Sequence, residues 1–457
     1  MIVDNNLEYP LYLQLYEYYK KRIVEGELKS GEKLPSKRYL SDSLGLSVNT
    51  VTRAYYLLEE EGFILAIERR GYFVEQLSNI NVGKSIQEVT SFKKDKAEEI
   101  LYDFSSSAIS ESDFPFYTFS KLYKKVIDKY RENILTNSDP NGKLEFKIAI
   151  SKYLMESRGL ITNPKNIVIS SGMEYLFQIL FYIFPQENIF GIENPGYDVL
   201  PSMIKSRGFG VVPIEIGPEG IDLDALEKSS VSILTITPSH QFPTGTIMPI
   251  SRRLQVLHWA NMSSKNYVIE DDYDSEFRYV GKPLDPLKSL DTSDKVIYMG
   301  SFSKSVAPSL RISYMILPES LMESLSEDAP FFICSVPVIE QMVMAEFLIN
   351  GHFERHLNRM RRIYKKNREV AIKLLEKDPK VLNISGADAG IHIVVEFDTK
   401  KTDSELKKEF LKSGISISPL SEYYSGGEPS HSKFILGFGG LTRESLTEGI
   451  GKMLQIL

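Results

Sequence analysis

A lysine and an arginine lie seven residues apart in the run GSFSKSVAPSLRISYM, which spans residues 300–315. Lys304 stands among small hydroxyl residues, Arg311 follows it, and apolar residues surround both charges. A lone lysine is usually a solvated surface charge, so this neighbourhood needs a chemical reason. A lysine amine can form a Schiff base with an aldehyde, and an arginine with nearby hydroxyls can bind a phosphate. The run therefore has the residue types for both tasks.

Short apolar segments alternate with helical patterns from about residue 102 onward. Each segment ends in a polar or glycine-bearing loop, and the segments read NIVIS, NIFGI, SILTIT, NYVIE and KVIYMG. This alternation predicts an α/β domain with a mostly parallel sheet. Since ligands bind outside the carboxyl ends of such strands, the residues that follow them form the candidate site.

Four kinds of chemical group follow these strands: a lysine, a carboxylate, a tyrosine and a phosphate-binding turn. Besides Lys304, Asp271 follows one strand and Tyr197 another, and small residues open a helical run after the first strand. Pyridoxal 5′-phosphate (PLP) needs all four groups. A lysine forms a Schiff base with its aldehyde, and a carboxylate holds its pyridine nitrogen protonated. A hydroxyl donates a hydrogen bond to its phenolate oxygen, and free backbone N–H groups bind its phosphate. The alternative is that each residue is ordinary: a surface lysine, a turn aspartate and a packing tyrosine.

The first 76 residues show a different pattern, that of three short helices and a hairpin. Apolar residues at helical spacing predict the helices, of which the second begins at Ser36 and ends at Gly45 and the third begins at Ser47. The run FILAIERRGYFVE predicts a β-hairpin. Two helices joined at a glycine indicate a helix-turn-helix whose second helix enters the major groove of DNA, with the hairpin as a wing. The alternative is a small helical domain without that role.

Local charge and local sequence favour DNA binding by this domain. Four basic residues and one acidic residue lie between Lys33 and Arg53, on the proposed DNA face. The runs LPSKR at 34–38 and SVNTV at 47–51 resemble the winged helix-turn-helix of the GntR family of bacterial regulators. This resemblance covers about residues 9–76 and implies operator binding. The expected DNA contacts are Ser36, Lys37, Arg38, Ser47, Asn49, Thr50, Arg53, Arg69, Arg70 and Gly71.

The second part of the chain carries a resemblance of its own. Its runs ITPSHQFPTG, VIEDDYDSEF and IYMGSFSKSVAPSLRISYM resemble the fold-type I PLP-dependent aminotransferases. With the first domain they are similar to the MocR subfamily, which joins a GntR winged helix to an aminotransferase-like domain, and to its GABA-responsive members. The resemblance implies a Schiff base at Lys304, pairing of Asp271 with the pyridine nitrogen and of Tyr273 with the phenolate oxygen, stacking of Tyr197 on the ring, and His240 near the 3-oxygen. The residues implied around the phosphate are Ser171, Gly172, Met173, Ser301, Ser303 and Arg311.

Three positions depart from the aminotransferase pattern. Ile435 stands where such enzymes place the arginine that holds the substrate carboxylate, and Val199 stands where the GABA-responsive regulators have an arginine. Asn137 falls where the enzymes use a tyrosine to reach the neighbouring subunit's phosphate. Candidates for the missing positive charge are Lys433, His431 and Arg443. We therefore expect a sensor with at most residual transamination.

These observations together predict a PLP-dependent, DNA-binding transcription regulator. An amino compound, or PLP itself, would act by imine exchange at Lys304, and the regulator would control genes of amino-acid or vitamin B6 metabolism. One alternative is an active aminotransferase with an accessory DNA-binding domain, and another is a GntR regulator whose second domain has lost its cofactor. The expected partners are operator double-stranded DNA, an amine or amino-acid effector, a second copy of the chain in a head-to-tail homodimer, and RNA polymerase.

The length of 457 residues indicates a multidomain protein. We expect a winged helix-turn-helix domain at 1–76, a flexible linker at 77–101 and an aminotransferase-like domain at 102–457, with a larger subdomain at about 150–350 and a smaller one from the remainder. The single cysteine, Cys334, excludes an intramolecular disulfide and gives no zinc cluster, so no metal is expected. The chain has no apolar run of membrane-spanning length and no secretory signal pattern, so we expect a cytoplasmic protein without membrane contact. The net charge of −7 does not by itself indicate nucleic-acid binding.

Overall fold

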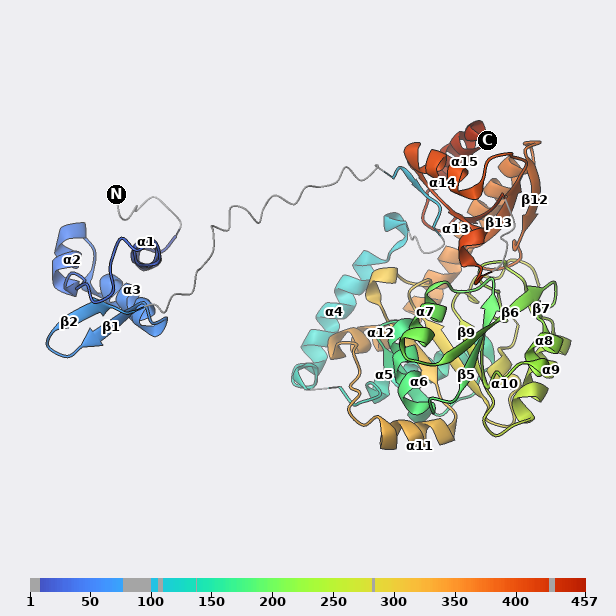
Figure 1. Ribbon diagram of the computed structural model, residues 1–457, viewed down its shortest axis with the longest axis horizontal. Coiled ribbons are helices and arrows are strands. Elements are labelled where there is room, and N and C mark those ends of the chain that lie inside the picture. Colours follow the sequence, from blue (N-terminus) through green and yellow to red (C-terminus); the bar gives the residue numbers. More distant parts are fainter. Residues whose placement is uncertain (1–8, 77–99, 106–109, 137, 282–283, 427–431) are drawn as a thin grey trace. The chain divides into compact units, whose positions relative to one another are not determined.

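The computed structural model describes residues 9–76, 100–105, 110–136, 138–281, 284–426 and 432–457. The chain divides into two compact units, Met1–Lys96 and Ala97–Leu457, each with its own buried core (Figure 1). The linker predicted at 77–101 lies almost wholly outside the described residues. Its last residue, Leu101, donates its backbone N–H to the carbonyl of Gly414 at 2.8 Å, so the second unit includes this residue.

The first unit consists of three helices and a two-stranded wing, as predicted. The hydroxyls of Ser36 and Ser47 each accept a hydrogen bond from a backbone N–H three residues later, which caps the second and third helices. The buried apolar face of the third helix, from Val51 to Leu58, packs mainly against the first helix. The elements are α1 (Leu11–Val24), α2 (Lys37–Leu44), α3 (Val48–Glu60), β1 (Ile64–Ile67) and β2 (Gly71–Val74).

An eight-stranded sheet forms the core of the larger subdomain of the second unit (Figure 1). Its order is β4-β11-β10-β9-β8-β5-β6-β7. From β10 to β6 the strands run parallel, whereas β11 and β7 are antiparallel to their neighbours. All five predicted segments are strands of this sheet, so the mostly parallel α/β prediction is confirmed. The strands are β4 (Ile167–Ser170), β5 (Ile189–Asn194), β6 (Gly210–Gly217), β7 (Gly220–Ile221), β8 (Ile233–Ile236), β9 (Tyr267–Asp272), β10 (Val296–Ser301) and β11 (Ser313–Ile316).

Helices cover both faces of this sheet, because its strands carry apolar side chains on both sides. In β10, Ile297 and Met299 face a layer that contains α6 and α11, whereas Tyr298 faces the layer of α5 and α12. The helix α4 lies outside the predicted 150–350 range but packs on α12, where Glu346 accepts hydrogen bonds from two of its lysines. The helices are α4 (Phe116–Tyr130), α5 (Leu144–Arg158), α6 (Met173–Ile183), α7 (Val199–Ser206), α8 (Leu223–Lys228), α9 (Ile250–Asn261), α10 (Leu287–Leu290), α11 (Glu319–Asp328) and α12 (Val338–Ile349).

A four-stranded antiparallel sheet forms the smaller subdomain, in the order β12-β13-β16-β15. The long helix α13 connects it to the larger subdomain in sequence and packs against α15. A two-residue strand from the beginning of the unit, β3 (Tyr102–Asp103), pairs in parallel with β14 (Ile415–Ser416). The remaining elements are β12 (Val381–Ser385), β13 (His392–Phe397), β15 (Ser418–Pro419), β16 (Lys433–Gly437), α13 (His352–Leu375), α14 (Asp403–Lys412) and α15 (Arg443–Ile456).

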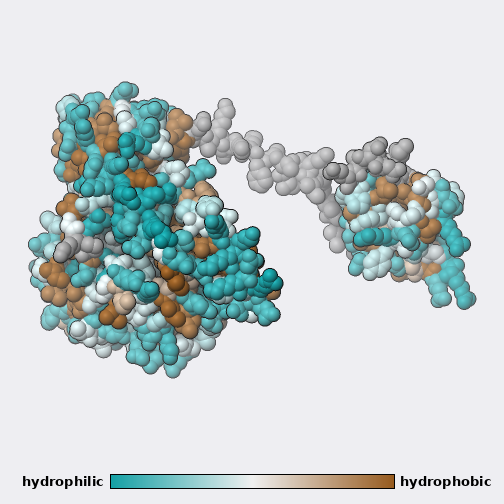
Figure 2. All heavy atoms as spheres, turned by 180° about the vertical axis from the view of Figure 1, so that it is seen from behind, coloured by the Kyte–Doolittle hydropathy of each residue, from teal (hydrophilic) through white to brown (hydrophobic). Residues whose placement is uncertain are grey.

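The surface of the second unit exposes large apolar side chains. Figure 2 shows apolar residues gathered in several places among polar ones on the face it displays. Many of the exposed residues come from α4, α5 and the segments that flank them, and from the loop before α12. They are Phe116, Tyr117, Leu135, Leu144, Ile148, Ile161, Phe331 and Ile333. Over the part of the chain that the structure describes, no helix is both long and apolar enough to cross a bilayer.

Candidate functional site

A cavity of about 370 Å³ opens at the carboxyl ends of the parallel strands. Its wall comes from the ends of β5, β8, β9 and β10, the first turn of α6 and the loop after β10. This is the edge of the sheet at which the sequence placed the site. The described lining residues are Gly172, Met173, Glu174, Phe177, Ile192, Glu193, Tyr197, Asp198, Leu200, Thr235, Thr237, Phe242, Asp271, Tyr273, Ser301, Ser303, Lys304, Pro308, Arg311, Ser313 and Tyr423.

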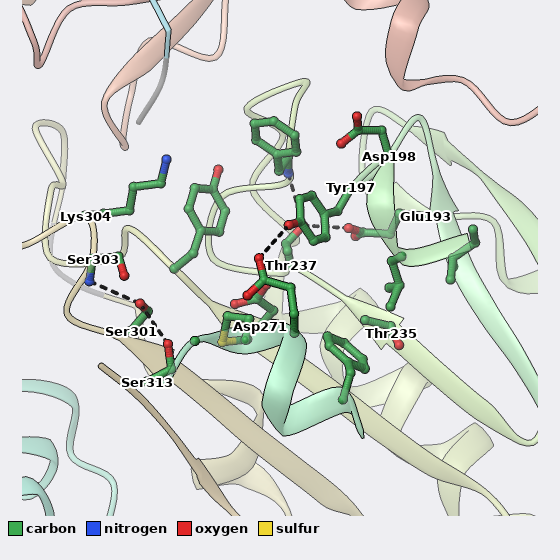
Figure 3. Close-up of a pocket in the computed structure, with 18 of the residues that line it drawn as sticks. Glu193, Tyr197, Asp198, Thr235, Thr237, Asp271, Ser301, Ser303, Lys304 and Ser313 are labelled. Atoms are coloured by element: carbon green, nitrogen blue, oxygen red, sulfur yellow. Dashed lines mark hydrogen bonds between the residues drawn. The ribbon is translucent and has the colours of Figure 1, made fainter. Parts of the chain in front are cut away.

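Lys304 enters this cavity from the loop that follows β10, on the opposite side from Tyr197 and Glu193 (Figure 3). Burial lowers the pKa of its amine to about 8, although Asp274 and Asp271 act in the opposite direction. Near pH 8 about half of the amine is therefore neutral, and the neutral form is the nucleophile. The side chain can attack a carbonyl carbon in the cavity.

Asp271 lies in β9 and carries its carboxylate to the cavity wall. Its Oδ1 atom is buried and has no hydrogen-bond partner among the described residues. Burial, together with the nearby Asp272 and Glu193, raises the pKa of Asp271 to about 8, and Lys304 offsets this only in part. Burying an ionised carboxylate without a hydrogen-bond donor costs free energy, so a cationic N–H group beside Asp271 would stabilise its ionised form. A protonated pyridine nitrogen is such a group, so Asp271 fits PLP.

Tyr273 and His240 form one hydrogen-bonded network at the cavity wall. The Nδ1 atom of His240 lies 3.1 Å from the Tyr273 hydroxyl and 2.9 Å from Asp274 Oδ2. Tyr273 lines the cavity, but His240 does not, so His240 acts on the cavity through the tyrosine. His392 is close enough that one ligand atom from each of His240, Asp274 and His392 lies within 4.8 Å of the others. The hydrogen bond between His240 and Asp274 accounts for two of these three atoms.

The turn between β4 and α6 forms one half of the predicted phosphate site. Gly172 has a φ of 108°, which L side chains rarely adopt, so the turn favours glycine; an ideal Cβ atom there would also lie 2.5 Å from Arg311 Nη2. Met173 lines the cavity beside it. Ser171 does not line the cavity, and its backbone N–H donates to Ser335 Oγ at 2.9 Å. The structure therefore brings two of the three predicted residues to the site.

The other half comes from the end of β10 and the start of β11. The Ser301 hydroxyl accepts a hydrogen bond from the backbone N–H of Ser303 and another from the hydroxyl of Ser313, each at 3.1 Å (Figure 3). Arg311 follows a single 3-10 turn, Pro308–Leu310, in a left-handed conformation with φ 51°. Ser301, Ser303, Ser313 and Arg311 thus line the same cavity as the first turn of α6, and hydroxyl, guanidinium and helix N-terminal groups together suit a phosphate dianion.

Several lining residues were not predicted, and the polar ones among them are Glu174, Glu193, Asp198, Thr235, Thr237, Ser313 and Tyr423. Glu174 pairs with Arg311 at 2.7 Å, between Oε2 and Nη2. Glu193 lies at the end of β5, where burial raises its pKa to about 7 and the Thr237 hydroxyl donates to it. The strand-end rule could have found Glu193, because it stands two residues before the turn that leads to Tyr197. Ser313 begins an antiparallel strand, so that rule does not point to it.

The positions that depart from the aminotransferase pattern give no carboxylate-binding cation in the described lining. Ile435 is buried in β16, paired with β13 and β15, and Val199 is the exposed first residue of α7. Lys433 lies 3.6 Å from Glu396, and Arg443 begins α15 on the surface. Asn137 and His431 are outside the described residues. In the described lining the cations are Lys304 and Arg311.

Most of the predicted DNA-contacting residues are exposed on the first unit. Arg38, Asn49, Arg53, Arg69 and Arg70 are exposed, and Thr50, Lys37 and Gly71 are half-buried. The guanidinium of Arg53 lies 4.2 Å from the ring centre of Tyr12, and the Lys37 amine lies 4.8 Å from that of Tyr72. The hydroxyls of Ser36 and Ser47 cap their helices. Aromatic rings thus support two of the cations while leaving them near the surface.

Comparison with known proteins assigns both units. Residues 11–74 match the bacterial regulatory proteins of the gntR family, and residues 108–452 match the aminotransferase class I and II family. The HTH-type transcriptional regulator YdeL of Bacillus subtilis (strain 168) is 35% identical over 453 residues, which covers 99% of this chain and 97% of YdeL. The probable rhizopine catabolism regulatory protein MocR of Rhizobium meliloti is 29% identical over 469 residues, 99% of this chain and 95% of MocR. The chain belongs to the MocR-type regulators of the GntR family.

Solved structures similar to this MocR-type chain include aminotransferases. The kynurenine aminotransferase of Pyrococcus horikoshii superposes with a TM-score of 0.70 at 22% identity, over 83% of this chain and 96% of the enzyme. The α-aminoadipate aminotransferase LysN of Thermus thermophilus superposes with a TM-score of 0.69 at 24% identity, over 78% of this chain and 92% of the enzyme. These similarities establish a fold-type I aminotransferase fold for the second unit. The resemblances stated from sequence, to GntR regulators and to aminotransferases, are both confirmed.

Proposed function

We propose that this MocR-type regulator binds PLP at Lys304 and senses an amino compound, or PLP itself, in the adjoining cavity. The observation that supports this most directly is the buried, unpartnered Oδ1 of Asp271 in the wall of the cavity that Lys304 enters. A relative that is 28% identical over 95% of this chain is named a pyridoxine biosynthesis transcriptional regulator, in Corynebacterium glutamicum. That name supports target genes in vitamin B6 or amino-acid metabolism.

The residues around the ring would hold and tune the cofactor. When bound, PLP supplies an aldehyde carbon that primary amines can exchange on. Lys304 would hold that carbon, and its amine would be released by an incoming primary amine. Asp271 would favour a protonated pyridine nitrogen, the Tyr273 hydroxyl would donate a hydrogen bond to the phenolate oxygen, and the Tyr197 ring would pack against the cofactor ring. His240 positions Tyr273 through the hydrogen bond between them.

Sensing is favoured over turnover because the described lining holds no cation for a substrate carboxylate beyond Lys304 and Arg311. Lys304 is engaged with the aldehyde carbon and Arg311 with the phosphate, so an α-carboxylate has no described partner. The bound amine would then change the state of Lys304 without being positioned for efficient proton transfer. The enzyme alternative predicts sustained keto-acid formation from amino acids, and that turnover, measured on purified protein, would contradict the sensor proposal.

The first unit would bind an operator through its exposed region, with α3 in the major groove and the β1–β2 wing along the backbone. Arg53 and Asn49 lie on the exposed face of α3, and Arg69 and Arg70 lie at the tip of the wing. The exposed apolar residues of α4, α5 and the loop before α12 are the candidate contacts of a homodimer, because contiguous exposed apolar surface marks protein–protein interfaces. A two-fold dimer would read two half-sites.

A spectroscopic titration tests the proposal. Addition of PLP to the purified chain should produce the visible absorbance of a protein-bound imine, and titration with a panel of amines and amino acids should change that spectrum for the true effector. A chain that stays colourless after PLP addition would contradict PLP binding. An effector found in this way should also change operator affinity in a gel-shift assay.

A further inference from the structure

The carboxylate of Glu174 occupies the position at which the phosphate site would receive its anion. Its Oε2 atom lies 2.7 Å from Arg311 Nη2, and its Oε1 atom accepts a hydrogen bond from the Tyr197 hydroxyl at 3.4 Å. Its own backbone N–H, at the start of α6, also lowers the pKa of this carboxyl group. Glu174 is the second residue of α6, so this N–H and the helix dipole favour an anion there. One carboxylate therefore engages the helix end, the arginine and the stacking tyrosine at once.

These groups are compact enough that a second anion would meet the first. An ideal Cβ at Gly172 would lie 2.5 Å from Arg311 Nη2 and 2.9 Å from Glu174 Oε2, so the turn, the guanidinium and the carboxylate touch one another. Burial alone would raise the pKa of Glu174, but its backbone N–H and Arg311 together hold that pKa below the usual value. Glu174 is therefore ionised near neutral pH, and a phosphate dianion beside it would be repelled.

The ion pair is open to displacement, because its side chains keep 56% (Arg311) and 38% (Glu174) of their surface exposed. Exposed pairs contribute little and exchange readily with other ions. Tyr197 is tied to the same carboxylate, and burial and Glu174 raise the pKa of its hydroxyl to about 12, so the hydroxyl remains a donor. When the carboxylate leaves, Tyr197 loses this restraint and Arg311 becomes available.

We propose that Glu174 is an internal competitor for the cofactor phosphate, which PLP must displace from Arg311 before it binds. This inference rests on the proposed function and deepens it, because the competition weakens PLP binding and makes occupancy sensitive to PLP concentration. The competition acts on the phosphate and not on the aldehyde. Pyridoxal, which has the aldehyde but no phosphate, therefore escapes it.

The test is a pair of titrations followed by visible absorbance on the full chain. Glu174→Gln removes the charge and keeps the shape, so PLP should bind about three- to tenfold more tightly than to the wild-type chain. Pyridoxal should bind to both proteins with the same affinity. Glu187→Gln is the matched control, because Glu187 is exposed and outside the cavity lining, and it should change neither affinity. Equal thermal unfolding midpoints without ligand verify that the variants are folded.

Each outcome has a distinct meaning. Unchanged PLP binding by Glu174→Gln would overturn the inference, and weaker binding would overturn it and indicate that Glu174 orients Arg311 for the phosphate. In both cases PLP binding itself would stand. A matching gain for pyridoxal would also overturn it, because the effect would not depend on the phosphate. If neither protein develops the visible band with PLP, the proposed function fails and the inference fails with it.

Discussion

The DNA-binding unit and the cavity of the second unit use charged side chains in opposite ways. The arginines proposed to contact DNA, such as Arg38, Arg53 and Arg70, are exposed to solvent. Lys304 and Asp271 are held in the cavity wall, and burial moves the pKa of each to about 8. Solvated cations bind a polyanion by counterion release, so their contribution depends on salt. Desolvated groups bind according to their protonation state, so theirs depends on pH.

Operator binding and cofactor binding can therefore be measured separately, because the first depends on salt concentration and the second on pH. Operator affinity should fall steeply with salt and change little with pH near neutrality. Cofactor binding should follow pH more strongly than salt.

The largest effect is expected from Lys304→Ala. Removal of the amine should abolish the visible absorbance of protein-bound PLP, because Lys304 is the primary amine that this cavity presents to an aldehyde. Operator binding by the PLP-free protein, measured by gel shift, should stay within about twofold of the wild-type chain, a shift of under ~1 kcal/mol. The exposed Lys366 on α13 gives the matched control, Lys366→Ala. A full visible band in Lys304→Ala would place the reactive lysine elsewhere.

For Arg53→Ala we expect the opposite result: weaker operator binding with unchanged PLP binding. Loss of a base or phosphate contact in the major groove should weaken operator binding by about 1–3 kcal/mol and leave the PLP spectrum intact. If Arg53 contacts a phosphate, the slope of log affinity against log salt should also fall by about 1. Arg362→Ala on the exposed side of α13 is the charge-matched control. Unchanged footprints and affinity would show that the exposed face of α3 does not read DNA.

Asp271→Asn tests the pH dependence assigned to the cavity. Without cofactor, the folded pKa of Asp271 is about 8 against an ordinary 3.8, so the folded state holds a proton that the unfolded state releases. The stability that this proton provides is complete below about pH 4 and is lost as pH rises to about 8. Relative to Asp271→Asn, the wild-type apoprotein should therefore lose up to about 1.4 kcal/mol of unfolding free energy per pH unit across this window.

Urea unfolding of both proteins at a series of pH values measures this difference. If the difference in unfolding free energy between the two proteins stays constant from about pH 4 to about pH 8, Asp271 is ionised in the apoprotein. The cavity carboxylate would then behave like the solvated arginines of the first unit, whose charge does not change over this range. Operator affinity of the two proteins should not differ.

The smallest effect is expected from Ser47→Ala. The Ser47 hydroxyl accepts the Thr50 backbone N–H at 3.0 Å and caps α3, so its loss should cost about 1 kcal/mol. Hydrogen exchange followed by mass spectrometry should show faster exchange of α3 amides and unchanged exchange of the β8 amides. Faster exchange in β8 as well would mean that the two units do not unfold independently.

The same contrast explains how much the sequence could predict. In the first unit, caps such as Ser36 and Ser47 and the hairpin at Arg69 and Arg70 depend on neighbours within a few residues, so local pattern was sufficient. In the second unit the strands and Lys304, Asp271 and Tyr273 could also be placed, because strand ends mark the cavity.

What could not be predicted depends on pairs far apart in the sequence. The contact between Glu174 and Arg311 joins positions separated by 137 residues, so no periodic pattern in the local sequence predicts it. The hydrogen bond from the Ser171 backbone N–H to Ser335 Oγ likewise joins residues that are 164 positions apart. The family resemblance implied that His240 lies near the PLP ring. In the structure Tyr273 lines the cavity and His240 contacts Tyr273 without lining the cavity itself.

The pairing of β3 with β14 determines which part of the second unit receives the chain that arrives from the DNA-binding unit. Leu101 and Tyr102 both donate their backbone N–H groups to the Gly414 carbonyl, and Phe104 donates to Ser416, so the incoming chain is anchored to the smaller subdomain. The cavity is lined mainly by the larger subdomain, and Tyr423 is the described lining residue that comes from the smaller one. Tyr423 and this anchor therefore belong to the same subdomain, so any displacement of the smaller subdomain relative to the larger one would move both the cavity wall at Tyr423 and the point at which the chain enters the second unit.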